Sequence, residues 1–225
     1  MKRAKTVAVM QPYFVPYAGY FRLFAAADEV VMLDNVQFPR RGHVHRNRLR
    51  RRDGALDWLT LPLRRAPFEA EIRDLRFAEN PSKEICARLQ RFRASVARGV
   101  GSSALYDAIP MTETRAPVDF IVDLLSRFCG LLELPFVDLR ASRLSLPEGL
   151  RGQDRILAIA SCLGATTYLN LAGGRSLYDP SAFMRHGIRL RVLAPYSGPI
   201  DSICERLDTE AIHDVVREIQ ANCAD

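Results

Sequence analysis

One segment of the sequence, residues 10–21 (MQPYFVPYAGYF), concentrates side chains that can bind a ligand. Aromatic rings stack on flat or apolar groups, and hydroxyls and amides form hydrogen bonds, as do the free N–H groups of a helix that begins after Gly19. The side chains that we expect to orient a substrate here are Gln11, Tyr13, Tyr17 and Tyr20. The alternative is that the tyrosines and prolines form a rigid aromatic plug beneath a loop.

The densest polar segment is residues 42–48 (GHVHRNR), which carries His43, His45, Arg46, Asn47 and Arg48. Arginine binds carboxylates and phosphates through two parallel hydrogen bonds, and a histidine with a pKa near neutrality can transfer protons. If the segment is extended, the two histidines and Asn47 lie on one side and the two arginines on the other. We therefore predict that this strip binds an anionic donor and deprotonates an amine; hydrogen-bonded surface histidines are the alternative.

Two further groups of polar residues follow predicted strands. Asp34 and Gln37 come after the second strand, where a carboxylate can act as a general base or bind an amine; a turn-forming Asp is the alternative. Asn170 precedes Gly173 and Gly174, and two glycines permit close backbone approach to a ligand and an anion-binding nest of N–H groups. All five residues are candidates for the site.

The hydrophobic pattern predicts the elements that must position these residues. A strand over residues 6–10, a helix over 21–27 and a strand over 30–33 have the length of one βαβ unit. A hairpin is expected from residues 44–49 and 57–63 around Asp53-Gly54. The remaining predicted helices cover residues 82–97, 117–132, 152–163 and a short stretch ending at 187, and the remaining strands cover 135–139, 166–170 and 188–193.

This alternation predicts an α/β fold with a mostly parallel, twisted, Rossmann-like sheet and helices on both faces. A chain of 225 residues with 48% hydrophobic content can bury one core, so we expect one domain over residues 1–225. Within it, residues 80–132 should be mainly helical and residues 196–225 should form a helical tail.

Charge and cysteine usage restrict the class of partner and the compartment. The net charge of +6 comes largely from arginines crowded into residues 40–52, which indicates a local anionic partner. No nucleic-acid-binding motif accompanies them, so nucleic acid is not favoured, and a phosphorylated small molecule or an acidic carrier protein fits as well. A solvated arginine face is the structural alternative. Five scattered cysteines without metal-ligand spacing, and no apolar run long enough to span a membrane, predict a cytoplasmic protein with reduced thiols.

Longer motifs resemble a known family. The stretches VAVMQPYFVPYAGYF, DEVVMLDNVQF, RGHVHRNR and the segment from Gly152 to Leu190 are similar, in order and spacing, to the WbqC-like family of bacterial proteins. The resemblance covers residues 5 to about 193 and weakens in the tail after Pro195. It implies a biosynthetic enzyme of surface-polysaccharide or specialised-metabolite assembly and leaves the reaction undefined.

The layout of the first βαβ unit also resembles the nucleotidyltransferase and pantothenate-synthetase group, whose first strand is followed by a HxGH motif. Tyr17-Ala18-Gly19-Tyr20 occupy the matching positions, so both histidines are replaced by tyrosine. The likeness therefore implies a shared fold without the imidazoles that steady phosphates during adenylyl transfer.

Together these features predict an enzyme that transfers an acyl or aminoacyl group to an amine, such as an amino sugar or amino acid. Asp34 or His45 would accept the amine proton, Arg46 and Arg48 would hold the donor's phosphate or the substrate's carboxylate, and Asn47 would help to orient the acceptor. No bound prosthetic group or metal is expected; the donor would be a coenzyme A or carrier thioester or an aminoacyl compound. The alternatives are a nucleotide-dependent activating enzyme and a non-catalytic binding component that docks an acidic carrier protein.

Overall fold

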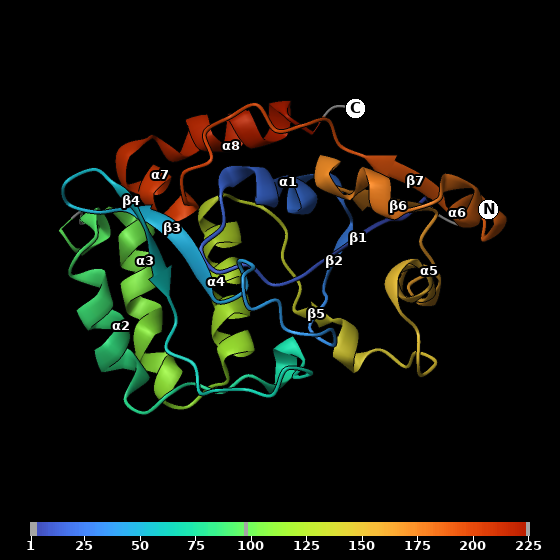
Figure 1. Ribbon diagram of the computed structural model, residues 1–225. Helices are drawn as coiled ribbons and strands as arrows, with labels where there is room; N and C mark the ends of the chain where they lie inside the picture. Colours follow the sequence, from blue (N-terminus) through green and yellow to red (C-terminus); the bar gives the residue numbers. More distant parts are fainter. Residues whose placement is uncertain (1–3, 97–98, 224–225) are drawn as a thin grey trace.

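The strand Thr6–Met10 (β1) lies at the centre of a five-stranded parallel sheet. The computed structural model describes residues 4–96 and 99–223. The other strands of this sheet are Glu29–Met32 (β2), Leu139–Arg140 (β5), Thr167–Asn170 (β6) and Arg189–Val192 (β7), and the spatial order is β5-β2-β1-β6-β7. The predicted parallel α/β fold is confirmed (Figure 1).

Alternating side chains of β1 explain why helices cover both faces of the sheet. Val7 and Val9 pack with the helices Gly152–Cys162 (α5) and Pro180–Arg185 (α6). Ala8 belongs to the larger core on the opposite face, with the helices Ala18–Ala26 (α1) and Pro117–Leu131 (α4). Val7, Ala8 and Val9 are all apolar because both faces of the strand are buried.

The strand order defines a topological switch point. The chain moves from β1 to β2 and β5 on one side, and then crosses to β6 and β7 on the other side of β1. In open parallel sheets, ligands bind outside the carboxyl ends of the strands that flank such a point. The loop after β1, which carries Gln11 and Tyr13, and the residues after Asn170 both leave the sheet there.

A separate antiparallel hairpin supplies much of the site. Its strands are Arg46–Arg50 (β3) and Leu56–Thr60 (β4), and the register places Arg48 opposite Trp58. The turn is built as the sequence indicated: Gly54 has φ +91°, and the Asp53 carboxylate accepts a hydrogen bond from the Ala55 N–H. The segment before Arg46 is bent, so the strand begins later than predicted.

The helix expected over residues 82–97 is shorter in the structure. It ends at Leu89 (α2, Pro81–Leu89), and a 3-10 turn follows at Arg93–Ser95. Phe92 is extended and forms an isolated β-bridge with Arg51, so pairing with the hairpin overrides the helical pattern. Ala97 lies outside the described residues, and the helix Val100–Ala108 (α3) was not predicted.

None of the described helices combines the length and apolar content needed to cross a membrane.

The strand expected over residues 135–139 pairs only at its end, as β5. The Arg140 side chain there is buried and binds the carboxylates of Asp138 and Asp119, at 2.7 and 2.5 Å. This ion-pair anchor replaces the hydrophobic anchoring that a longer strand would give.

The C-terminal segment forms two helices, Ile203–Thr209 (α7) and Ile212–Ala221 (α8), which pack on α3 and α1 (Figure 1). The backbone of α3 approaches α7 closely, because a Cβ at Gly101 would lie 2.0 Å from the Cys204 carbonyl oxygen. The buried Arg206 of α7 binds the carboxylates of Glu210 and Glu218 and so fixes α8 to α7.

We predict that Gly101→Ala lowers the free energy of unfolding by about 1–3 kcal/mol, because the added methyl forces α3 and α7 apart. Gly130→Ala is the matched control, since a Cβ at this position of α4 meets no atom within 4 Å; it should be neutral or stabilise by up to about 1 kcal/mol. Urea unfolding followed by circular dichroism measures both changes. Equal effects of the two substitutions would contradict the close contact.

Candidate functional site

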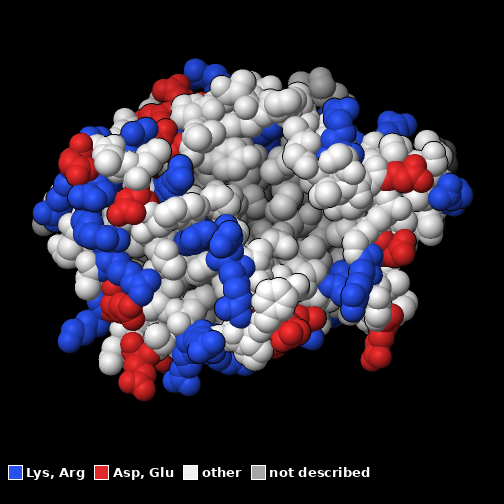
Figure 2. Space-filling view, viewed as in Figure 1, with Lys and Arg blue, Asp and Glu red and all other residues white. Residues whose placement is uncertain are grey.

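A cleft of about 440 Å³ lies between the first loop, the hairpin and the segment before α7. We call it the aromatic cleft. Its lining residues are Tyr13, Tyr17, His43, Asn47, Arg48, Arg50, Leu56, Trp58, Ile200 and Asp201. Figure 2 shows that Lys and Arg side chains are more numerous on the half of this face that carries the hairpin, beside a central hollow lined mainly by uncharged residues. The structure thus brings together four of the predicted residues: Tyr13, Tyr17, Asn47 and Arg48.

The rings of the cleft form a continuous strip. The Tyr13 and His43 ring centroids are 4.7 Å apart, and those of His43 and Trp58 are 5.5 Å apart. The guanidinium carbons of Arg46 and Arg48 lie 4.2 and 5.3 Å from the Trp58 ring centroid. A flat or ring-shaped ligand can therefore stack in the cleft beside positive charge.

The first loop is held in an unusual backbone conformation at Val15. This β-branched residue has φ +40° and is buried, a combination that costs free energy unless the surroundings enforce it. Its carbonyl oxygen accepts hydrogen bonds from Asn47 Nδ2 and from the Ser202 hydroxyl, each 2.7 Å long. The Ile203 N–H donates to the neighbouring Pro16 carbonyl, also at 2.7 Å. These bonds fix Tyr13 and Tyr17 on either side of the strained residue.

His43 is the histidine that faces the cleft. Partial burial lowers the pKa of its imidazole below 6.5, and the positive charge of Arg46 lowers this pKa further, while a hydrogen bond to Asn47 opposes the shift. The ring is therefore neutral at pH 7 and can accept a proton.

His45, predicted as a proton acceptor, lies elsewhere. It is absent from the cleft lining, and its ring packs against Phe38 with centroids 4.9 Å apart. Burial and the charge of Arg46 lower its pKa to about 4. The two histidines diverge because the chain before Arg46 is bent, so alternation along a strand does not apply to residues 43–45.

Asp34, the other predicted proton acceptor, is buried after the end of β2. Its carboxylate accepts hydrogen bonds from the Ser142 N–H at 2.9 Å and the Ser142 hydroxyl at 2.6 Å. It ties β2 to the segment after β5, and it does not line the aromatic cleft.

Three more predicted residues lie near the sheet edge without entering the cleft. Tyr20 is buried, and its hydroxyl donates to the Gln11 carbonyl oxygen at 3.0 Å, which fixes the start of the loop. Gln37 donates from Nε2 to the Phe68 carbonyl oxygen and lines a different cavity, of about 530 Å³, with Asn35 and Arg155. Their ligand-binding roles stay predictions.

The segment after β6 that was predicted to form an anion-binding nest, Asn170 to Gly174, is tightly packed. Asn170 is buried, and a Cβ at Gly174 would lie 2.1 Å from its Nδ2 atom, so glycine is required for this contact. Asn170 Oδ1 accepts the Leu171 N–H at 2.8 Å, whereas Gly173 is exposed. All three lie at the carboxyl end of β6 and outside the cleft lining.

The two arginines of the predicted strip differ in role. Arg46 donates to the carbonyl oxygens of Arg41 and Gly42, at 2.9 and 3.3 Å, and so holds the bend before β3. Arg48 is exposed, lines the cleft, and forms no ion pair with any described residue. Arg48 is therefore available to an anionic ligand.

Several cleft residues are not among those predicted from the sequence. Trp58 could have been found, because the predicted hairpin turn places it opposite Arg48. Arg50 and Asp201, which pair at 2.6 Å, had no local signal, since 150 residues separate the hairpin from the tail.

Within residues 4–96 and 99–223, no group of three or more His, Cys, Asp or Glu residues could hold a metal ion, and all five cysteines are free.

The strand order and the cleft at the carboxyl end of β1 define a Rossmann-like α/β protein with an added hairpin and helical tail. Residues 11–199 match the WbqC-like protein family, and the chain belongs to this family. It is also 26% identical over 189 residues to the uncharacterized protein Rv1507c of Mycobacterium tuberculosis, a match that covers 83% of this chain and 80% of that protein. No solved structure matches the chain.

We predict that Ser202→Ala lowers the free energy of unfolding by about 1–2 kcal/mol, because it removes a donor to Val15 and the cap of α7. Ser161→Ala, at an exposed position of α5, is the control and should change stability by less than about 0.5 kcal/mol. Urea denaturation measures both. A neutral Ser202→Ala would mean that the Asn47 and Ile203 hydrogen bonds hold the loop without the Ser202 hydroxyl.

A second prediction concerns pH. The folded protein keeps His45 neutral down to a pKa of about 4, whereas the unfolded chain protonates it near 6.5. His45 therefore makes the protein lose stability as the pH falls from about 6.5 to about 4. His45→Gln should flatten the pH dependence of the unfolding midpoint in this window. The exposed His213 provides the control His213→Gln, which should leave the slope unchanged.

Proposed function

We propose that this protein transfers an acyl or aminoacyl group to an amine in polysaccharide or specialised-metabolite biosynthesis. The observation that carries the proposal is the neutral His43 in a cleft with aromatic rings and the unpaired Arg48. The rings suit a sugar or another flat acceptor, and the guanidinium suits the phosphate of a coenzyme A or carrier-bound donor. Family membership is compatible with this role and does not define the reaction.

In the proposed reaction, the amine nitrogen attacks the carbonyl carbon of a thioester. The N–C bond forms while the C–S bond breaks, His43 accepts the proton released by the amine, and the sulfur leaves as a thiol after taking up that proton. Tyr13, Tyr17 and Trp58 orient the acceptor, and Arg48 holds the donor. His43 takes the role expected of Asp34 or His45, because neither of those residues lines the cleft.

The test begins by deleting the gene and identifying by mass spectrometry the amine that accumulates. The purified protein is then assayed with that amine and thioester donors, and the released thiol is measured. His43→Gln should reduce turnover by about 10²–10⁴-fold, and His213→Gln should not. Full product formation by His43→Gln, combined with loss in Arg48→Glu, would replace catalysis by docking of an acidic carrier protein.

The same assay gives a pH prediction. Because the pKa of His43 lies below 6.5, the proton acceptor stays available in mildly acidic solution. The half-maximal rate should therefore lie below pH 6.5. A half-maximal rate above pH 6.5 would contradict a role for this imidazole.

A second candidate function is nucleotide-dependent activation of a substrate. The strand order favours it, because the switch point between β1 and β6 is where such folds bind nucleotides. Calorimetric titration with ATP tests it directly. Absence of binding would remove this candidate.

A further inference from the structure

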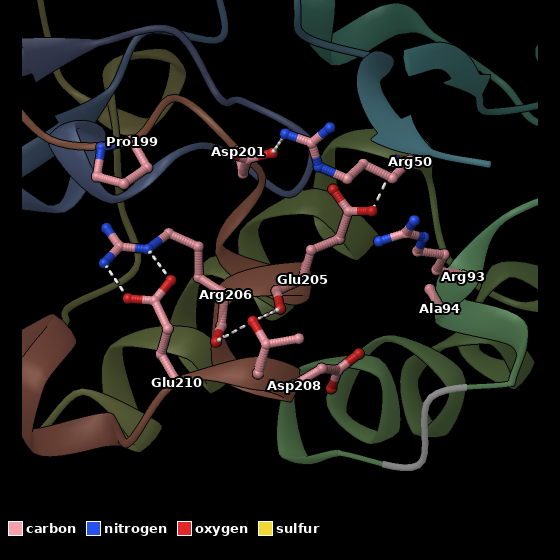
Figure 3. Close-up of a pocket in the computed structure, with 10 residues that line it drawn as sticks. Arg50, Arg93, Ala94, Pro199, Asp201, Glu205, Arg206, Asp208 and Glu210 are labelled. Carbon is pink, nitrogen blue, oxygen red and sulfur yellow. Dashed lines mark hydrogen bonds and ion pairs between the residues drawn. The ribbon is translucent and has the colours of Figure 1, made fainter. Parts of the chain in front are cut away.

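A second cavity adjoins the aromatic cleft and is strongly charged. It has a volume of about 260 Å³, and we call it the charged cavity. Its lining residues are Arg50, Arg93, Ala94, Pro199, Asp201, Glu205, Arg206, Asp208, Thr209 and Glu210. Arg50 and Asp201 line both spaces, and their ion pair of 2.6 Å forms the common wall (Figure 3).

Several of its charges are already neutralised within the protein. Arg206 binds Glu210 and Glu218, and Arg50 binds Asp201. Figure 3 shows the Arg206 guanidinium turned toward Glu210 and the Arg50 guanidinium turned toward Asp201. These ion-paired side chains line the cavity, and their charges are largely neutralised by each other, so they offer little net charge to a ligand.

Arg93 and Glu205 are different, because they face each other without pairing. Figure 3 shows the Arg93 guanidinium pointing toward the Glu205 carboxylate, and no ion pair within 4.0 Å joins them. Arg93 is exposed and has no acidic partner among the described residues. Glu205 Oε1 accepts the Arg50 N–H at 2.6 Å, whereas the buried Oε2 has no hydrogen-bond partner among them.

The carboxylate of Glu205 is therefore incompletely compensated. Burial raises its pKa, and the neighbouring Asp201 adds to the shift, against the opposing effect of Arg50 and Arg93. A buried carboxylate oxygen without a donor calls for an additional partner. A cationic group would supply both the missing charge and the missing hydrogen bond.

We propose that the charged cavity binds a small amino acid, whose ammonium group pairs with Glu205 and whose carboxylate pairs with Arg93. A ligand with both charges bridges two opposite side chains that leave a gap between them, whereas a simple amine or carboxylate satisfies only one. The volume of about 260 Å³ restricts the ligand to a small molecule.

This inference deepens the proposed function, because it places an amino acid as co-substrate beside the aromatic cleft, across the Arg50–Asp201 wall. Binding is measured without turnover, so the two proposals can fail separately. Amino acid binding without any transfer activity would contradict only the proposed function. Transfer to an amine by a protein that binds no amino acid would contradict only the proposed amino acid site.

The experiment is isothermal titration calorimetry of the full chain with L-alanine, L-serine and L-glutamate, and with ethanolamine and propionate as ligands of single charge. We expect at least one amino acid to bind, and each single-charge ligand to bind at least 10-fold more weakly. No heat from any amino acid up to about 10 mM would overturn the proposal.

Substitutions locate the binding. Glu205→Gln keeps an oxygen that can accept the Arg50 N–H, and Arg93→Gln alters an exposed side chain, so the fold should be retained. Each should weaken amino acid binding at least 10-fold. Arg91→Gln is the matched control, because Arg91 is exposed, close in sequence and outside the cavity lining. Unchanged binding in both cavity variants, or an equal loss in the control, would overturn the assignment.

Discussion

The carbonyl oxygen of Val15 is the point on which the site depends. Asn47 from the hairpin and Ser202 from the tail both donate to it, so one atom joins three segments that are distant in sequence. The strained φ of +40° is tolerated because those two buried donors, with the Ile203–Pro16 hydrogen bond, over-determine the loop. These bonds hold Tyr13 and Tyr17 beside the hairpin and the tail, and the Phe14 N–H, which donates to the His43 carbonyl oxygen at 3.1 Å, joins the same loop to His43.

The fold could be predicted from local patterns wherever a strand or helix is set by its own residues. TVAVM and the first three residues of TYLN are mostly β-branched, aromatic or aliphatic, and the α4 and α5 segments show helical spacing, so these elements could be predicted. The helix predicted to Ala97 failed at Leu89 because Phe92 pairs with Arg51, a contact that no local window contains. This pairing between distant segments overrides the helix propensity of the residues after Leu89, so the predicted helix was too long.

The site was predictable only in part, for a related reason. Residue type, and the density of aromatic and polar residues in two short segments, predicted four residues of the cleft: Tyr13, Tyr17, Asn47 and Arg48. The distinction between His43 and His45 depends on a bend two residues before β3, and the burial of Asp34 depends on Ser142, 108 residues away. Residue type gave the chemistry, whereas the choice among residues of one type needed contacts between distant segments.

The hydrogen bond from Ser202 to Val15 spans 187 residues. During synthesis, the first loop therefore emerges from the ribosome long before its second anchor exists. The sheet strands β1 and β2 can pair early, but the aromatic cleft acquires its wall only after residue 202 has been translated. A ligand that needs this cleft therefore cannot engage the chain before residue 202 has been translated.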